Sequence, residues 1–432
     1  MSSPSLPFTR LHTAAERAGL APAALLVNLL RGPLADSSSH PGARHTLLAV
    51  CPNSEAVARA ALRAAQEANT PLLYAATLNQ VDRDGGYTGW TPATFADFVR
   101  AETERLDLEV PILLGLDHGG PWKKDTHRRD DLAYETTMQE VKRSITACVE
   151  AGYDLLHLDP TVDRRLPPDE PVPLDAIVER TIELMRHAED ARRAADRPAI
   201  AYEVGTEEVS GGLQSADRFE SFLDRLDEAL RAHDLPSPSF VVGDVGTTLA
   251  GEDFDADRAR RLTAVATDRI GALLKGHYTD DVAAPEAYPL SGMGGANVGP
   301  GLSAVEATAL RELGTLEERL DQTSGLPDAL RDAVVDSGRW RKWLSGEEDG
   351  QPFEALPEER QRWLVDTGSR YVWADSAVKA ARERLYDHVA PYRDADAYVQ
   401  WRLKTAILHY MHAFNLIDLT DRVMEALPED VP

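Results

Sequence analysis

The feature that most constrains the fold of this chain is a regular alternation of short apolar runs with longer amphipathic segments. Short runs rich in Val, Leu, Ile and Ala are typical of buried parallel strands. The runs lie at 45–50, 71–77, 111–116, 154–158, 199–204, 239–244, 271–276 and 295–299. This rhythm predicts an α/β protein with a (β/α)8 TIM barrel, because a doubly wound open sheet more often has fewer strands.

The longer segments between these runs have helical spacing. They lie at 54–68, 93–105, 131–151, 174–196, 216–233, 255–269 and 303–320. The connection at 277–294 is predicted to be a loop. Three regions follow, with an N-terminal helical addition and connector at 1–40, the barrel at 41–322 and a C-terminal helical extension at 323–432. The extension is expected to pack on the barrel or to mediate association into a homo-oligomer.

Composition excludes several kinds of partner. The formal net charge of −26 would repel nucleic acid and anionic membranes, and a surface solvated for high salt explains this acidity. No segment has the unbroken apolar length of a membrane helix, and the N-terminus lacks the layout of a signal peptide. Only Cys51 and Cys148 are present, which is not a disulfide scaffold. We therefore expect a cytoplasmic protein.

Polar residues follow the carboxyl ends of the predicted strands, where barrels of this kind place their functional groups. His118, Glu207 and His277 follow the third, fifth and seventh strands. Because side chains from alternate strands share a layer, these three are expected to converge and to hold Zn²⁺ with an open position for substrate. Each of them is equally well explained as an ordinary hydrogen-bonded residue of the rim.

Two aspartates are candidate acid/base groups. Asp117 stands beside His118, and a metal there would favour the ionised carboxylate and acidify a nearby substrate hydroxyl or C–H. Asp159 ends the fourth strand and is the second candidate. Its alternative role is to cap the turn that follows.

Two glycine-rich loops complete the rim. The loop after the second strand contains "NQVDRDGGYTGWTP" and is either a lid that contacts substrate or a structured turn. Its candidate binding residues are Asn79, Gln80, Gly86, Tyr87 and Thr88. The loop "NVGPGLS" is either a phosphate cradle before a helix or a Gly/Pro turn capped by Ser303. Its candidate residues are Asn297, Gly299, Gly301 and Ser303.

Successive blocks of the chain resemble one known family. They include "LLGLDHGGP", "AGYDLLHLDPT", "EVGTEEVSGG", "GHYTD", "NVGPGLSAVEATALRELGTLEERL" and "SRYVWADSAVKAARERLYDHV". These blocks resemble the accessory, non-catalytic subunit family of class II D-tagatose-1,6-bisphosphate aldolases, formerly labelled tagatose-6-phosphate kinases. That family is similar in turn to class II, zinc-dependent ketose-bisphosphate aldolases, which are (β/α)8 barrels.

The resemblance implies roles for particular residues. Asp117 corresponds to the acid/base, and His118 and His277 correspond to metal ligands. The aldolases take a further histidine from a His-Gly step after the sixth strand, where this chain has "GDVGTT". Glu207 is the hypothesised substitute. Nothing in the sequence recognisably cradles ATP, so the kinase label finds no support in the residues.

Two functions remain open at this stage. In the first, the protein acts in carbohydrate metabolism on a ketohexose or its phosphate with a divalent metal, by retro-aldol cleavage as a lyase or by epimerisation. In the second, it is a non-catalytic subunit that stabilises a separate class II tagatose-bisphosphate aldolase. The presence of Asp117, His118, Glu207 and His277 on one rim favours the first, and the missing third histidine favours the second.

Overall fold

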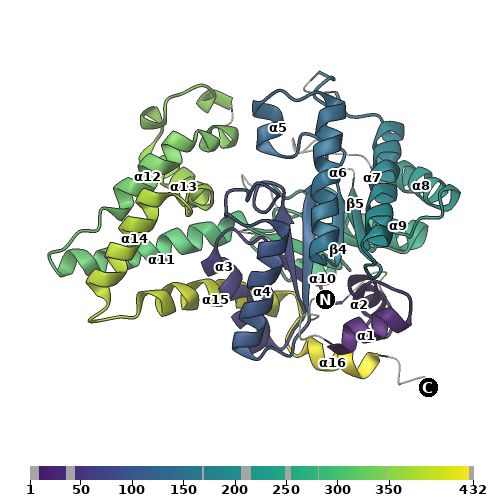
Figure 1. Ribbon diagram of the computed structural model, residues 1–432, viewed down its shortest axis with the longest axis horizontal. Coiled ribbons are helices and arrows are strands. Elements are labelled where there is room, and N and C mark those ends of the chain that lie inside the picture. The colour runs from purple at the N-terminus through teal and green to yellow at the C-terminus, as the bar shows by residue number, and fades with distance from the viewer. Residues whose placement is uncertain are drawn as a thin grey trace.

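The centre of the molecule is a closed barrel of eight parallel strands in sequential order, β1 to β8 (Figure 1). The computed structural model describes residues 9–35, 44–167, 170–205, 216–248, 254–280, 282–344 and 346–427. The strands are Leu47–Val50, Leu72–Thr77, Ile112–Gly119, Leu155–Leu158, Ala201–Gly205, Phe240–Val242, Leu273–Gly276 and Gly295–Val298. Pairing of β1 with β8 closes the barrel, which confirms the predicted fold class.

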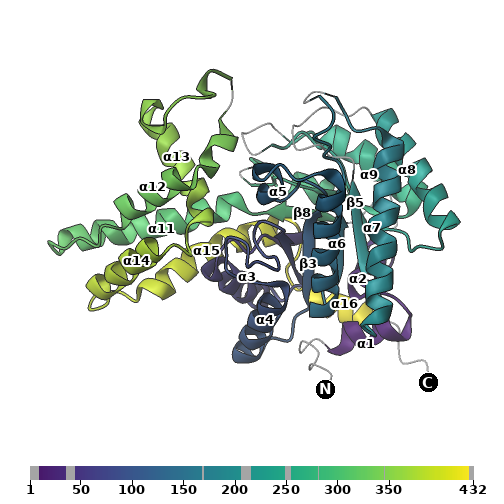
Figure 2. The same ribbon diagram turned by 45° about the horizontal axis from the view of Figure 1, so that its top comes forward.

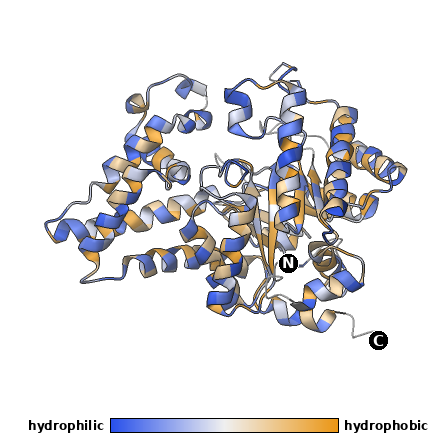
Figure 3. Cartoon of the chain, viewed as in Figure 1, coloured by the Kyte–Doolittle hydropathy of each residue, from blue (hydrophilic) through white to orange (hydrophobic). Residues whose placement is uncertain are grey.

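A layer of helices surrounds the strands. It comprises α3 (Glu55–Ala68), α4 (Pro92–Leu106), α6 (Tyr134–Ala151), α7 (Leu174–Ala194), α8 (Ala216–Ala232), α9 (Ala256–Ile270) and α11 (Pro300–Arg319). The connections also contain two short helices, α5 (Asp125–Arg129) and α10 (Ala287–Leu290). The predicted loop at 277–294 therefore includes one helical turn. In Figure 3 the strands are mostly orange and the outer faces of the helices mostly blue, as expected for strands buried on both sides.

Local sequence signals explain where these helices begin and end. Before α3, the Ser54 hydroxyl accepts a hydrogen bond from the Val57 backbone N–H, and Asn69 ends the helix in the left-handed conformation. Helix α11 begins at Pro300, three residues before the predicted start. Proline is favoured at a first helical position because its fixed φ suits the helix and it lacks an N–H that would have no intrahelical partner there.

The predicted N-terminal helical addition forms two helices in the described residues. These are α1 (Thr9–Arg17) and α2 (Pro22–Arg31). Gly19 between them adopts a positive φ of 65°, and Pro22 starts the second helix. Helix α2 contacts β5 and α16 (Leu419–Ala426), so it lies at the end of the barrel beside the C-terminal helix (Figure 1).

The C-terminal extension leaves the barrel along α11 and then returns to it. Its elements are α12 (Leu326–Ser337), η1 (Arg339–Trp343), η2 (Gly346–Glu348), η3 (Phe353–Ala355), α13 (Glu358–Gly368), η4 (Ser369–Tyr371), α14 (Ser376–Val389), α15 (Ala395–Ala413) and α16. Helices α12, α13 and α14 lie to one side of the barrel (Figures 1 and 2). Helix α15 runs back against α3, and the Asp418 backbone N–H donates to the Ala68 carbonyl. Among the described residues, no helix is both long and apolar enough to cross a bilayer.

Candidate active site

An irregularity in β3 brings Asp117 and His118 to the same site. Adjacent side chains of a regular strand point to opposite faces. Here the register between β3 and β4 shifts between Leu116 and Gly119, and His118 has a left-handed φ of 52°. A bulge of this kind changes the direction of side chains, which is why bulges are common beside active sites. Both side chains therefore reach the same group of histidines.

Gly120, in the glycine pair that follows His118, is required by a close steric contact. A Cβ atom on Gly120 would lie 1.7 Å from the backbone oxygen of Asp159, so no other residue fits without moving the backbone. Gly120 thus allows the end of β3 to approach the end of β4 closely.

Three imidazoles meet at this rim, and one of them was missed by the sequence analysis. His157 lies in β4, whereas His118 and His277 are the predicted pair. Their ring centres are 5.0 Å apart for His118 and His157, 4.7 Å for His118 and His277, and 5.2 Å for His157 and His277.

The three rings direct nitrogen atoms at the carboxylate of Asp117. His157 Nδ1 lies 2.9 Å from Oδ1 of Asp117, and His277 Nε2 lies 3.8 Å from the same oxygen. His118 Nε2 lies 3.8 Å from Oδ2. Asp117 is therefore the common neighbour of all three histidines.

A second carboxylate, Glu203 of β5, lies beneath the histidines. Its Oε1 is 3.3 Å from Nε2 of His277 and 3.5 Å from Nδ1 of His157, and its Oε2 accepts a hydrogen bond of 2.6 Å from Nζ of Lys275. The β5 carboxylate that meets His277 is thus Glu203. The predicted ligand Glu207 lies outside the described residues.

The surroundings keep these carboxylates ionised. Burial alone would raise the pKa of Asp117, but His118, His277 and His157 hold it well below its usual range. Burial likewise opposes ionisation of Glu203, yet Lys275 and the nearby histidines lower its pKa to about 2. Burial lowers the pKa of His118 more than the neighbouring carboxylates raise it, so this ring is neutral near pH 7. Ionised carboxylates and neutral imidazole are the forms that bind a metal.

Asp159 orients His118 from outside the cavity. Its Oδ2 lies 2.5 Å from His118 Nδ1 and 2.6 Å from Nζ of Lys123, while its Oδ1 accepts a 2.5 Å hydrogen bond from the Thr161 hydroxyl. Burial would raise the pKa of Asp159, but Lys123 and His118 lower it well below its usual range. A carboxylate bound to one imidazole nitrogen leaves the other free to bind a ligand. Asp159 does not line the cavity, so the position favours this orienting role over the catalytic one.

A cavity of about 160 Å³ opens above Asp117. It is lined by Cys51, Asn53, Thr77, Asn79, Gln80, Tyr87, Asp117, His118, His277, Tyr278, Asp280, Asn297, Gly299, Pro300, Lys342, Trp343, Arg370 and Tyr371. The last four belong to the C-terminal extension, for which the sequence predicts packing on the barrel or association but no part in the site. The extension thus forms one wall of the cavity.

The loop after β2 is a compact turn whose residues divide into two groups. Asn79, Gln80 and Tyr87 line the cavity, whereas Gly86 and Thr88 do not. A Cβ atom on Gly86 would lie 2.3 Å from the Gln80 oxygen, and the Thr88 hydroxyl donates to the same oxygen at 2.6 Å. These contacts fold the loop on itself, which favours the structured-turn interpretation over a lid.

The predicted phosphate cradle before α11 is already filled by a side chain of this protein. Oδ1 of Asp280 accepts hydrogen bonds from the backbone N–H of Gly299 at 2.9 Å and of Gly301 at 2.7 Å. Ser303 lies inside the helix, and its carbonyl accepts a 3.4 Å bond from the Ser369 hydroxyl. Ser303 is therefore not the helix cap, and the N–H groups expected to bind phosphate are satisfied by Asp280.

Asn297 connects β8 to the reactive centre. Its Nδ2 donates to Oδ2 of Asp117 at 3.2 Å. Its buried Oδ1 accepts no hydrogen bond from any described residue, although the side chain lines the cavity.

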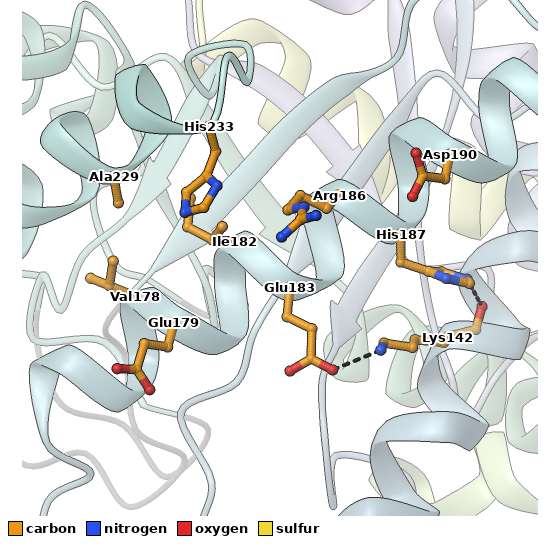
Figure 4. A pocket seen from close by; sticks show the side chains of 10 residues that line it. All are labelled: Lys142, Val178, Glu179, Ile182, Glu183, Arg186, His187, Asp190, Ala229 and His233. Carbon is orange, nitrogen blue, oxygen red and sulfur yellow. Dashed lines mark hydrogen bonds and ion pairs between the residues drawn. The ribbon is translucent and has the colours of Figure 1, made fainter.

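A larger hollow of about 440 Å³ lies on the outer helices and lacks these features. Figure 4 shows Lys142, Glu183 and His187 beside it, on α6 and α7. Lys142 pairs with Glu183 at 2.7 Å, and His187 Nε2 lies 2.9 Å from the Lys142 carbonyl oxygen. Because this hollow lies on the outer helices, away from the strand ends, the cavity above Asp117 is the better candidate.

The site residues that were not predicted from the sequence share one sequence feature. His157, Glu203 and Lys275 each interrupt a short apolar strand, in "LLHL", "AYEVG" and "LLKG". A polar residue inside a buried strand of a barrel needs a partner, and here the partners are one another.

Comparisons with known proteins show which proteins this chain is similar to. A family model of D-tagatose-1,6-bisphosphate aldolase subunit GatZ/KbaZ-like proteins matches residues 35–232. The crystal structure of a probable tagatose 6 phosphate kinase from Sinorhizobium meliloti is 23% identical, with a TM-score of 0.68, over 85% of this chain and 100% of that one. A fructose-bisphosphate aldolase from Campylobacter jejuni is 11% identical, with a TM-score of 0.47, over 87% of this chain and 91% of that one. Over residues 35–232 the chain thus matches the D-tagatose-1,6-bisphosphate aldolase subunit GatZ/KbaZ-like family, in agreement with the resemblance seen in its sequence blocks.

Proposed function

We propose that this protein binds a ketose phosphate beside a divalent metal ion and cleaves or epimerises it, as an enzyme of carbohydrate metabolism. The observation that carries the proposal is the convergence of His118, His157 and His277 on the carboxylate of Asp117. The match to a tagatose-bisphosphate aldolase subunit family supports the substrate class.

The donors here suit a divalent metal such as Zn²⁺, which takes imidazole and carboxylate ligands. Ligand atoms of Asp117, His157, Glu203 and His277 lie within 4.8 Å of one another, and so do those of His118, His157 and Asp159. His118, His157 and His277 would hold the ion, and Asp159 would fix the orientation of His118. A bound divalent ion supplies Lewis-acid polarisation of a carbonyl or hydroxyl oxygen.

Asp117 is the proposed acid/base. Its pKa is held well below the usual range by the histidines, so it is available as a proton acceptor at neutral pH. In retro-aldol cleavage Asp117 would take the proton of the substrate hydroxyl while the adjacent C–C bond breaks. The electron pair of the broken C–C bond would then form an enediolate. Asn297 holds the Asp117 carboxylate through a hydrogen bond from Nδ2.

Metal binding tests the first step. Protein stripped with a chelator is titrated with zinc as wild type, His157→Ala, His277→Ala and the control His187→Ala, which changes a histidine on the outer helices. We expect about one zinc per chain in wild type and control, and at least a tenfold weaker affinity in the two site variants. A wild type that binds neither zinc nor manganese would contradict the proposal.

Turnover tests the second step. Cleavage and epimerisation are assayed with D-tagatose 1,6-bisphosphate and related ketose phosphates on the zinc-loaded protein. Asp117→Asn should keep the metal and lose about 10²- to 10⁴-fold in kcat, which is the usual contribution of an acid/base group.

The second candidate is a subunit that assists a separate aldolase, because the matching family is described as an aldolase subunit. This function predicts that the zinc-loaded protein alone turns over no ketose phosphate but forms a stable complex with a class II aldolase and raises its thermal stability. Asp117→Asn would leave that stabilisation unchanged, whereas under the first proposal it lowers kcat about 10²- to 10⁴-fold.

A further inference from the structure

The C-terminal extension places cations at the wall of the cavity. Lys342 belongs to η1 and Arg370 to η4, and both line the cavity together with Trp343 and Tyr371. The hydrogen bond from the Ser369 hydroxyl to the carbonyl of Ser303 attaches η4 to the start of α11. These cations are therefore held against the barrel rim.

In the described part of the chain the buried Arg370 forms no ion pair with a carboxylate, although Asp280 lies near enough to act on it electrostatically. Arg370 is 4% exposed and donates to the Thr367 carbonyl and, at 2.9 Å, to the Tyr371 hydroxyl. Buried charges are normally paired, because removing a charge from water is costly. An arginine left unpaired in a chain of net charge −26 indicates a site for an incoming anion.

Lys342 shares the same aromatic surface. Its Nζ lies 5.1 Å from the ring centre of Trp343 and 4.8 Å from that of Tyr371, and the Arg370 guanidinium lies 5.3 Å and 4.6 Å from these two rings. Like charges on shared rings repel each other, and an anion between them would relieve that repulsion.

The nearby carboxylates, Asp125 and Asp280, offset these positive charges only in part. Lys342 and Arg339 both approach Asp125, at 3.4 Å and 3.5 Å, so two cations share one acid. Burial would raise the pKa of Tyr371, but Arg370 and Lys342 lower it, as expected beside two positive charges. Asp280 directs its carboxylate at the backbone of Gly299 and Gly301.

We propose that Arg370 and Lys342 bind the phosphate group of the sugar phosphate. This inference rests on the proposed function for its ligand class. A phosphate monoester carries a charge of about −1.5 to −2 near pH 7, which matches two cations. Arginine binds phosphate with two parallel N–H groups, and lysine adds a point charge. The sugar would then lie between these two cations and Asp117, because all three side chains line the same cavity.

The test measures binding by calorimetry to chelator-treated protein, so that it does not depend on a metal or on turnover. The probes are D-tagatose 1,6-bisphosphate, inorganic phosphate and D-tagatose. The variants are Arg370→Gln, Lys342→Gln and the control Arg331→Gln, which removes a positive charge that pairs with Asp332 elsewhere in the extension.

We expect the Kd of the bisphosphate to rise at least tenfold in Arg370→Gln and Lys342→Gln and to stay unchanged in Arg331→Gln. Weakened binding of inorganic phosphate by the same two variants, with unchanged D-tagatose binding, would assign the effect to the phosphate group. Because the Lys342 side chain is 37% exposed, its variant should fold even if Arg370→Gln does not. Equal bisphosphate affinity in wild type and folded Lys342→Gln would overturn the inference. Zinc binding by Lys342→Gln should remain unchanged, which separates this result from a failure of the metal site.

Discussion

The Nζ atom of Lys275 lies 2.6 Å from Oε2 of Glu203 inside the barrel, and neither side chain is more than 1% exposed. Loss of one partner leaves a buried charge without compensation. Lys275→Met should therefore lower the free energy of unfolding by about 3–5 kcal/mol. The double variant Lys275→Met/Glu203→Gln should lose clearly less stability than Lys275→Met. Urea unfolding of both single variants and of the double variant measures the free energies of this double-mutant cycle. Additive losses would show that the two side chains do not interact.

The same pair predicts a pH dependence of stability. The pKa of Glu203 is lowered to about 2, because the effect of Lys275 and the histidines outweighs that of burial. A carboxyl group with a depressed folded-state pKa stabilises the fold above its ordinary pKa and loses this contribution as pH falls. The stability difference between wild type and Glu203→Gln should thus be largest near neutral pH and shrink between pH 4.5 and about 2. Urea unfolding at a series of pH values measures it, and a constant difference would contradict the prediction.

Two glycines should respond in opposite directions to alanine. At Gly120 the new Cβ would lie 1.7 Å from the Asp159 backbone oxygen. Gly120→Ala should therefore lower the free energy of unfolding by roughly 3 kcal/mol or more. At Gly314, inside α11, no atom lies within 4 Å of the new Cβ. Gly314→Ala should raise the free energy of unfolding by about 0.5–1 kcal/mol, since alanine is the better helix former. Thermal unfolding of both variants tests the pair, and a stable Gly120→Ala would argue against the close approach.

Asp280 should control anion binding at the start of α11. Its carboxylate accepts the N–H groups of Gly299 and Gly301 as an N-cap side chain would. Asp280→Ala should lower the free energy of unfolding by about 1–2 kcal/mol, which is the usual effect of removing a helix cap. Sulfate should raise the Tm of this variant more than that of wild type, because a helix N-terminus binds anions. An equal effect of sulfate on both proteins would show that the freed donors do not form an anion site.

The sequence by itself determined the barrel, the order of its elements and part of the rim. Strands and helices each carry a local hydrophobic period, so the eight strands could be found without any knowledge of their contacts. Asp117, His118 and His277 were found because they follow strands at the end where barrels place functional groups. His157 was missed because one histidine in an apolar strand is equally typical of a core residue.

Only the tertiary structure decided how these residues work together. The bulge that turns Asp117 and His118 to one site depends on the register of β3 against β4, which no local pattern specifies. The placement of Arg370 beside the rim depends on a chain that leaves the barrel along α11 and returns. Local periodicity fixes which residues form an element, but contacts between distant segments arise from packing and charge compensation across the whole fold.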